Sequence, residues 1–221
     1  MKKYAVIVAG GTGSRMGAEK PKQFLEINGK PILKITVEKF LSAFDDIQVI
    51  VVLPKQHEKT GEQILASDIE INHVLTATGG ETRFHSVKKG LALVPDNAIV
   101  FVHDAVRCLV SIELIKRCYE SALENGNAIP AIEVKDSIRV ETHNGFEVVD
   151  RSRLRIIQTP QTFFSNSIKK AFEQEYEPSF TDEATVAERY GIKIHVVEGG
   201  DENIKITSPF DLQVASSLLR G

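Results

Sequence analysis

The sequence predicts an α/β fold: a mostly parallel sheet with helices on both faces and one β-hairpin that projects as an arm. Strand-like and helix-like segments alternate along most of the 221 residues, which is the order found in sheets of this kind. The strand-like segments are continuous apolar runs, as expected for strands buried on both faces. Around Asn144-Gly145 this order gives way to two alternating segments, and that dipeptide is a strong hairpin signal.

The elements follow in chain order from these patterns. Apolar runs at Tyr4–Val8, Val49–Leu53 and Ile99–Val102 define three strands, and Thr82 is a candidate cap for the third helix. The predicted strands are residues 3–8, 48–53, 71–76, 98–102 and 127–133, and the predicted helices are residues 31–43, 56–66, 82–93 and 111–124. Ligands of such sheets bind beyond the carboxyl ends of the strands, so motifs that begin where strands end should converge on one site.

The hairpin is predicted from Ser137–Glu141, a turn at residues 142–145, and Phe146–Val149. A hairpin inserted into an α/β domain has few neighbours of its own chain to pack against. We therefore expect residues 135–158 to form a projecting arm on a single domain that spans residues 1–221. The alternative is a solvent-exposed hairpin on a monomer.

Composition limits the kinds of partner. A net charge of −3 argues against a general affinity for nucleic acid or for an anionic membrane. The two cysteines, Cys108 and Cys118, lack paired-motif spacing, which argues against a disulfide framework or a zinc site. The N-terminus enters a strand without a charged and apolar leader, and no apolar run approaches the roughly 20 residues of a membrane helix. These features predict a reduced, cytoplasmic protein.

A glycine-rich loop, AGGTGSRMG at residues 9–17, follows the first strand, and KPKQF follows at residues 20–24. Closely spaced glycines let backbone N–H groups approach an anion, and Arg15 and Lys22 add positive charge, so the pattern is typical of a polyphosphate site. The loop lacks the Gly-Lys-Ser/Thr of a P-loop, and the dinucleotide fingerprint fails because Met16 stands where its third glycine should be. The alternative is a tight strand-to-helix turn with incidental basic residues.

Motifs along nearly the whole chain carry a family resemblance. The glycine-rich loop and its Pro-Lys-Gln sequence are similar to the signature of the sugar-phosphate nucleotidyltransferases, and the ungapped Pro-Lys-Gln points to the cytidylyltransferases among them. Further motifs occur in the matching order: GGETR at 79–83, VHDAVR at 102–107, QTPQTF at 158–163, TDEA at 181–184 and NIKIT at 203–207. Together they resemble the family of 2-C-methyl-D-erythritol 4-phosphate cytidylyltransferases.

This resemblance implies a Rossmann-like α/β fold and a transferase of non-mevalonate isoprenoid biosynthesis. Such an enzyme joins CTP and 2-C-methyl-D-erythritol 4-phosphate to give 4-diphosphocytidyl-2-C-methyl-D-erythritol and pyrophosphate. The resemblance also implies Mg²⁺, held mainly by the CTP phosphates, with the chain's own metal ligands unassigned. It further implies a homodimer in which the 135–158 arm embraces the second subunit.

The resemblance assigns residues to roles. The catalytic cations are Arg15, Lys22, Lys205 and Arg151, with Arg151 reaching the acceptor phosphate from the arm of the partner subunit. The CTP-binding positions are Ala9, Gly10, Gly11, Gly13, Gly80, Glu81, Ser86 and Asp104. The acceptor-binding positions are Asp104, Arg107, Ser137, Arg151 and Thr159. Glu81 stands where the family more often has aspartate, which changes the reach of the carboxylate but not its hydrogen-bonding type.

Three residues keep more than one interpretation. Asp104 could contact the acceptor, the ribose or the metal, or be a solvated or capping aspartate without such a role. Arg83 could belong to the site or mark a helix start that Thr82 caps. His103 invites a general-base role, yet a phosphate monoester is already nucleophilic near pH 7, so we expect His103 to be structural.

One departure from the family pattern bears on the acceptor. Val106 and Cys108 stand where the family usually has alanine and proline, and the missing proline is expected to loosen the loop after Arg107. Valine also occurs there in the D-ribitol-5-phosphate cytidylyltransferases, so synthesis of CDP-ribitol is the alternative activity. The TDEA motif and the compact segment before Gln158 favour the methylerythritol enzymes.

A catalytically inactive protein that binds a nucleotide or a sugar phosphate is a hypothesis of a different class. Loss of Arg15, Lys22 or Lys205 would favour it, and the sequence has all three.

Overall fold

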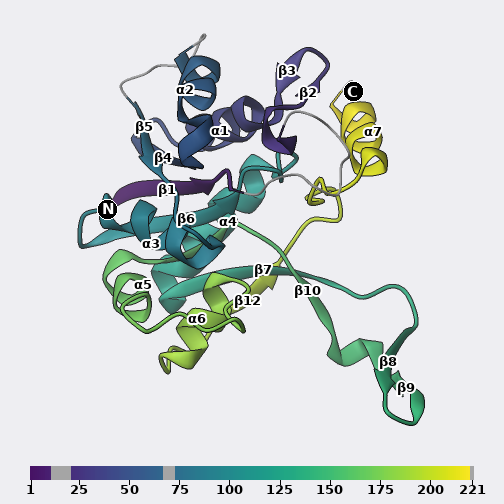
Figure 1. Cartoon of the computed structure of the whole chain (residues 1–221). Helices are drawn as coiled ribbons and strands as arrows, with labels where there is room; N and C mark the ends of the chain where they lie inside the picture. Colours follow the sequence, from purple (N-terminus) through teal and green to yellow (C-terminus); the bar gives the residue numbers. More distant parts are fainter. Residues whose placement is uncertain (11–20, 67–72, 220–221) are drawn as a thin grey trace.

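The computed structural model describes residues 1–10, 21–66 and 73–219 of the chain (Figure 1). The strands are β1 (Lys2–Val8), β2 (Glu26–Ile27), β3 (Lys30–Pro31), β4 (Ile47–Leu53), β5 (Val74–Thr78), β6 (Ala98–Asp104), β7 (Asn127–Glu133), β8 (Ile138–Thr142), β9 (Gly145–Val149), β10 (Arg155–Ile157), β11 (Gln161–Phe164) and β12 (Val196–Glu198). The α-helices are α1 (Ile32–Ala43), α2 (Glu58–Ala66), α3 (Arg83–Ala92), α4 (Ile112–Asn125), α5 (Ser165–Ala171), α6 (Glu183–Arg189) and α7 (Pro209–Leu218).

A mixed sheet runs through the centre of the molecule (Figure 1). Its strand order is β10-β7-β11-β6-β1-β4-β5, with β12 also paired to β7. The core strands β6, β1, β4 and β5 are parallel, while β11 lies antiparallel between β6 and β7. The carboxyl ends of the four parallel strands therefore meet at one edge, as the sequence predicts.

Helices cover both faces of this sheet, which confirms the predicted fold class. On one face, Leu33 and Phe40 of α1 and Ile115 of α4 pack in one apolar cluster with alternate residues of β1 and β4. On the other face, α3, α5 and α6 share a second cluster with the remaining strand residues. Gly90 permits the close approach of α3, because a Cβ there would lie 2.5 Å from Cγ1 of Val6.

Most predicted elements agree with the structure within a few residues. The third strand is shifted by up to three residues: it is predicted at 71–76 and the structure places it at Val74–Thr78, while residues 67–72 lie outside the described part. It also departs from the expectation of burial on both faces, since β5 is an edge strand and Leu75 is exposed. The strands and helices that follow residue 150 were not assigned from the sequence.

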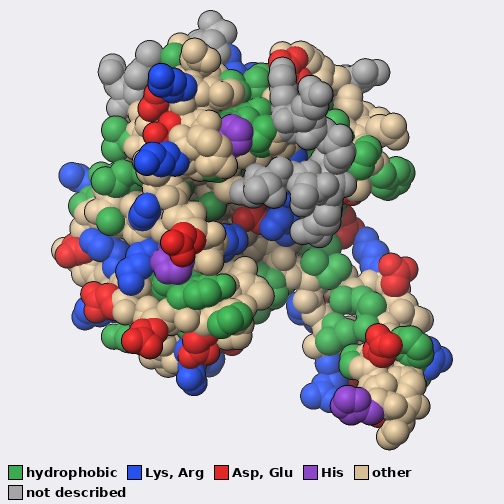
Figure 2. Space-filling model, in the orientation of Figure 1, with side chains coloured by type: hydrophobic (Ala, Val, Ile, Leu, Met, Phe, Trp, Pro, Cys, Tyr) green, Lys and Arg blue, Asp and Glu red, His purple; other side chains and the backbone are tan. Residues whose placement is uncertain are grey.

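The hairpin prediction is confirmed by β8 and β9, which pair from Ile138 with Val149 to Thr142 with Gly145. Gly145 has a φ of +112°, a conformation that residues with a side chain rarely adopt. The hairpin stands away from the body of the molecule, and hydrophobic side chains gather on its surface (Figures 1 and 2). Phe146 and Val148 are 66% and 74% exposed, so this arm leaves apolar surface uncovered in the single chain.

Among the described residues, no helix combines the length and the apolar character that crossing a membrane requires.

Candidate functional site

A polar cavity of about 170 Å³ lies at the carboxyl end of β6. Its lining comes from several elements: the start of α3, the end of β6, the segment between β10 and β11, the start of α6 and the segment before α7. Asp104, Arg107, Thr159 and Lys205 all face it. The fold thus brings together four of the predicted site residues at the expected edge of the sheet.

Asp104 lies at the centre of a cluster of cations. Its Oδ1 lies 3.2 Å from Nε of Arg83, and its Oδ2 lies 2.8 Å from Nζ of Lys205 and 3.8 Å from Nε of Arg107. Burial alone would raise the pKa of Asp104, but the three positive charges outweigh burial and hold the pKa well below its usual range. Asp104 is therefore an ionised, buried carboxylate, and the interpretation as a solvated or capping aspartate is wrong.

Arg83 also belongs to this cluster, and its other partner is Glu183. The guanidinium donates from Nη1 to Oε1 and, at 3.1 Å, from Nη2 to Oε2 of the fully buried Glu183. Burial lowers the pKa of Arg83, but the carboxylates of Glu183 and Asp104 reverse this and raise it above its ordinary value. Thr82 caps α3 by accepting a hydrogen bond from the His85 N–H. The helix start at Thr82 is therefore compatible with a place for Arg83 in the cavity lining.

Glu183 does not line the cavity but holds Arg83, which does, and sequence reasoning missed this supporting role. It belongs to the TDEA motif, which carried part of the family resemblance but gave this glutamate no role. Its partner Arg83 is 100 positions away in the sequence, so no local pattern could pair the two.

A network of amides holds the segment that carries Lys205. Asn203 donates from Nδ2 to the Thr159 carbonyl at 2.9 Å, and Gln158 donates from Nε2 to the Gly200 carbonyl at 2.8 Å. Arg107 donates from Nη1 to the Asn203 carbonyl at 2.7 Å. These contacts join the segment before β11 to the segment before α7 and so fix the distance between Thr159 and Lys205. The amide residues were not predicted as site residues.

His103 lies behind the cavity, on the core side of Asp104. It is fully buried, with Nδ1 2.9 Å from Oγ1 of Thr159 and Nε2 3.2 Å from the Arg107 carbonyl oxygen. Burial lowers the pKa of His103 to about 3; the Asp104 carboxylate and the bond to the Arg107 carbonyl oppose this effect, and the charges of Arg107 and Arg83 add to it. His103 is therefore neutral near pH 7, which agrees with the expected structural role.

The low pKa of His103 predicts a pH-dependent stability. The unfolded chain binds a proton at this histidine below about pH 6.5, whereas the folded chain stays neutral down to about pH 3, so stability must fall as the pH is lowered through this window. From pH 7 to pH 5 we expect His103 to reduce the free energy of unfolding by about 2 kcal/mol. Urea unfolding at both pH values checks this. The loss of unfolding free energy between pH 7 and pH 5 should be about 2 kcal/mol larger in the wild type than in His103→Phe. Equal losses in the two proteins would contradict the low pKa of His103.

Three of the predicted CTP-binding residues, Gly80, Glu81 and Ser86, lie between the end of β5 and the first turn of α3. Gly80 donates its N–H to Oγ of Ser86 at 3.0 Å, and Ser86 donates to the Thr82 carbonyl at 3.0 Å. A Cβ on Gly80 would lie 2.9 Å from the His85 carbonyl carbon, so the tight turn requires glycine. Glu81 is exposed at the tip of this loop. Gly80 and Ser86 thus maintain the loop shape, and contact with the base stays a prediction.

The glycine-rich loop that is predicted to bind phosphate starts directly after β1, at Ala9. Ala9 donates its N–H to the Val52 carbonyl, and the buried Gln23 donates from Nε2 to the Ala9 carbonyl at 2.7 Å. This bond brings the Pro-Lys-Gln motif, with Lys22 at the start of a short 3-10 helix, back to the end of the strand. Gly10 is exposed beside it. Of the other predicted loop residues, Gly11, Gly13 and Arg15 lie outside the described part of the chain.

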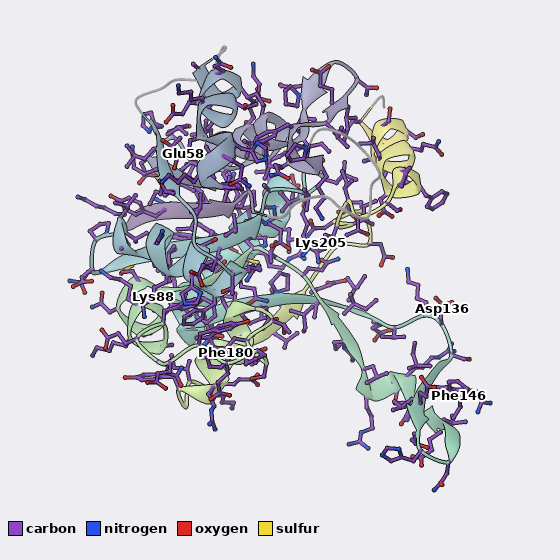
Figure 3. The ribbon with its side chains drawn as sticks, in the orientation of Figure 1. Glu58, Lys88, Asp136, Phe146, Phe180 and Lys205 are labelled. Carbon is purple, nitrogen blue, oxygen red and sulfur yellow. The ribbon has the colours of Figure 1, made fainter. Side chains whose placement is uncertain are left out.

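Two predicted acceptor residues lie on the arm instead of at the cavity. Ser137 is exposed just before β8, and Arg151 begins a 3-10 turn after β9, where it donates to the Lys135 carbonyl. Neither lines the cavity. Figure 3 shows the separation: Lys205 lies on the body, whereas Asp136 and Phe146 lie along the arm. The single chain therefore assembles part of the predicted acceptor site.

Cavity carboxylates do not form a metal site of their own in the described segments. No group of three or more His, Cys, Asp or Glu side chains is placed there to hold a metal ion. Both oxygens of Asp104 already face cations.

Comparisons with known proteins match the whole chain. A family profile described as IspD, 2-C-methyl-D-erythritol 4-phosphate cytidylyltransferase, matches residues 4–221. The chain is 48% identical over 220 residues to the 2-C-methyl-D-erythritol 4-phosphate cytidylyltransferase of Bacteroides fragilis, a match that covers 99% of this chain and 100% of that protein.

Solved structures agree with these matches. The 4-diphosphocytidyl-2C-methyl-D-erythritol synthase of Anaerococcus prevotii superposes with a TM-score of 0.84 at 27% identity, covering 100% of this chain and 96% of that one. The 2-C-methyl-D-erythritol 4-phosphate cytidylyltransferase of Francisella tularensis gives 0.81 at 31% identity, covering 98% and 99%. The likeness therefore extends over sequence, fold and length.

Proposed function

The chain belongs to the 2-C-methyl-D-erythritol 4-phosphate cytidylyltransferase family, and on that premise we propose how its own residues carry out the reaction. It joins CTP and 2-C-methyl-D-erythritol 4-phosphate to give 4-diphosphocytidyl-2-C-methyl-D-erythritol and pyrophosphate, a step of non-mevalonate isoprenoid biosynthesis. The observation that carries the proposal is the cation cluster of Arg83, Arg107 and Lys205 around Asp104 at the carboxyl end of β6.

The chemistry explains why cations dominate this site. A phosphate oxygen of the acceptor attacks the α-phosphorus of CTP, and both reactants are anions. Two unit charges about 4 Å apart repel by about 4 kcal/mol at an effective dielectric near 20. The protein therefore has to neutralise charge and align the two phosphates, with little covalent chemistry of its own. No general base is required, which fits the low pKa of His103.

Within the described site, Lys205 and Arg107 are the cations best placed for the reacting phosphates. Lys205 reaches the cavity from the segment before α7, and its side chain is 41% exposed. Arg107 also lines the cavity, and its Nε is buried without a hydrogen-bond partner among the described residues. Arginine and lysine can donate charge-assisted hydrogen bonds to such oxygens. Lys22 and Arg15 are assigned to the triphosphate of CTP by the family motif.

Magnesium enters this proposal as part of the substrate, bound to CTP. Mg²⁺ is commonly held by substrate phosphates together with one or two carboxylates, and it lowers the negative charge of the triphosphate. This matches a cavity whose central carboxylate is already paired with cations.

A second copy of the chain completes the acceptor site in this proposal. An isolated two-stranded hairpin is marginally stable in water, and this arm exposes Phe146 and Val148. Packing against a second subunit would cover these side chains and bring Ser137 and Arg151 of the partner subunit to the cavity. The arm's distance from its own cavity supports this arrangement (Figure 3).

The Arg151→Ala variant tests the arm. We expect the KM for the acceptor to rise about tenfold, since a charge-assisted hydrogen bond contributes about 1.5 kcal/mol, while the KM for CTP changes less. Steady-state kinetics with each substrate varied in turn measures both. Arg153→Ala, in the same 3-10 turn, is the matched control and should leave both KM values near wild type. A larger rise for CTP than for the acceptor would contradict the role of Arg151.

The departure at Val106 does not favour the ribitol alternative. Val106 is 6% exposed, shares an apolar cluster with Ile32 and Ile206, and does not line the cavity. Cys108 is fully buried in the same cluster, where it packs in the apolar core, and the looser loop expected from the missing proline stays a prediction.

Pyrophosphate release tests the proposed function directly. Purified protein, CTP and Mg²⁺ are mixed with 2-C-methyl-D-erythritol 4-phosphate or, separately, with D-ribitol 5-phosphate. We expect rapid release with the first acceptor only. A preference for D-ribitol 5-phosphate would replace the proposed acceptor. No release with either, together with measurable CTP binding, would support the inactive binding protein instead.

A further inference from the structure

The turn from Asp104 to Arg107 carries two of the side chains that face the cavity, and its backbone is held by several hydrogen bonds. The Arg107 N–H donates to the Asp104 carbonyl at 3.0 Å, which closes the turn. The Ala105 N–H donates to the Val8 carbonyl at 3.1 Å, and the Ala105 carbonyl accepts from Oγ1 of Thr36 at 2.7 Å. The direction of Asp104 and Arg107 into the cavity thus depends on the shape of this turn.

His103 connects the two ends of the turn. Its Nε2 lies 3.2 Å from the carbonyl oxygen of Arg107, the last residue of the turn. Its Nδ1 lies 2.9 Å from Oγ1 of Thr159, and the same oxygen accepts the N–H of Asp104, the first residue, at 3.2 Å. The imidazole ring packs edge-on against Phe40, with the ring centroids 5.0 Å apart. The buried imidazole therefore contacts Arg107 directly and Asp104 through the Thr159 hydroxyl.

The partners of the ring decide which nitrogen carries the proton. The Arg107 carbonyl oxygen can only accept, so Nε2 must carry a hydrogen to bond with it. Oγ1 of Thr159 accepts from Asp104 and has one hydrogen of its own, which it can donate to an unprotonated Nδ1. The opposite neutral tautomer would set two acceptors against each other at Nε2. Full burial opposes the doubly protonated ring and outweighs the attraction of the adjacent Asp104 carboxylate, and the charges of Arg107 and Arg83 add to the effect of burial.

We infer that His103 is a positioning residue: as the neutral Nε2–H tautomer, it joins the Arg107 carbonyl to the Thr159 hydroxyl and fixes the Asp104–Arg107 turn for acceptor binding. The role of His103 in acceptor binding rests on the proposed function, whereas its tautomer does not. His103 touches neither substrate in this arrangement. It acts through the direction that the turn gives to Asp104 and Arg107.

Nitrogen-15 NMR of the histidine side chains tests the tautomer in the wild-type protein. The His103 signals are assigned by their loss in His103→Phe or, if that variant does not fold, in His103→Gln. We expect a protonated Nε2 and an unprotonated Nδ1 at pH 7, unchanged at pH 5. A protonated Nδ1 at pH 7, in either the other tautomer or the cation, would overturn the inference.

Kinetics test the positioning role. For His103→Phe we expect kcat/KM for the acceptor to fall about fivefold through a higher KM, while the KM for CTP stays within about twofold, because one hydrogen bond of about 1 kcal/mol is lost on the acceptor side. His103→Gln, whose amide can donate to the Arg107 carbonyl, should recover part of the loss. His73→Phe is the matched control, since His73 lies beside Gln48 and Ile47, before β5.

These outcomes separate the inference from the proposed function. A wild-type protein that does not turn over 2-C-methyl-D-erythritol 4-phosphate would remove the proposed function, with the tautomer still decided by NMR. The positioning role would be overturned if the wild type is active and both His103→Phe and His103→Gln leave the KM for the acceptor unchanged. It would also be overturned if these variants raise the KM values for the acceptor and for CTP equally.

Discussion

Lys205→Ala should lower turnover by about 10²–10³, the effect of removing one donor that stabilises developing negative charge. Lys205 is a predicted catalytic cation that lines the cavity, and its Nζ lies 2.8 Å from Oδ2 of Asp104. Its removal also leaves Asp104 with two cations in place of three, so the carboxylate would repel an incoming phosphate more strongly. Single-turnover pyrophosphate release with saturating CTP and acceptor measures this loss.

Lys169→Ala is the matched control for Lys205. Lys169 forms a comparable ion pair, with Nζ 2.7 Å from Oδ1 of Asp96, but it lies on α5 and does not line the cavity. Its turnover should stay near that of the wild type, because an exposed ion pair contributes little. Lys205→Arg should retain more activity than Lys205→Ala, since it keeps the charge. Near-normal turnover in Lys205→Ala would remove Lys205 from the mechanism.

Arg83→Met should destabilise the fold by about 3 kcal/mol or more, the size of effect expected when one partner of a buried ion pair is removed. Glu183 is fully buried, and Arg83 neutralises it with two parallel hydrogen bonds. Burial raises the pKa of Glu183 above its ordinary value, and Arg83 opposes this rise, so the pKa rises further when Arg83 is removed. The stability difference between the wild type and Arg83→Met should therefore become smaller as the pH is lowered toward the ordinary pKa of glutamate, about 4.3, because Glu183 then becomes neutral in the variant.

Chemical denaturation at a fixed protein concentration measures the change in the free energy of unfolding. The double variant Arg83→Met/Glu183→Gln should recover part of the loss, because it no longer buries an unpaired charge. Arg189→Met is the matched control: its partner Glu177 is at the surface, so a change within about 1 kcal/mol is expected. An equally small change in Arg83→Met would show that the buried pair does not stabilise the fold.

The predicted and observed hairpins show how far local patterns reach. Asn144-Gly145 and the alternating segments beside it encode a turn and two strands within a dozen residues, and β8 and β9 formed there. The strands of the parallel core were predicted for the same reason, because a run such as Ile99–Val102 is apolar on both faces. The edge strand β5 was placed less well, since its exposed residues follow from its position in the sheet.

The site divides in a similar way. Motif resemblance placed Asp104, Arg107, Thr159 and Lys205, and the fold brought them to one cavity. The resemblance gave no role to Glu183, Gln158 or Asn203, because these residues act through hydrogen bonds to residues far away in the sequence. Ser137 and Arg151 were assigned to the same acceptor site, yet within one chain they lie on the arm, so their assignment stays a prediction.

The sequence by itself determined the alternation of the main strands and helices up to residue 133, the hairpin and the family, because these depend on local periodicity and on motifs of a few residues. Tertiary structure alone decided that Glu183 pairs with Arg83 across 100 positions and that Thr159 meets His103 across 56. A buried charge or imidazole is stable only if its partners lie within hydrogen-bond distance. That geometry is set when the sheet assembles, and from it follow the ionised Asp104 and the neutral His103 on which the proposed chemistry depends.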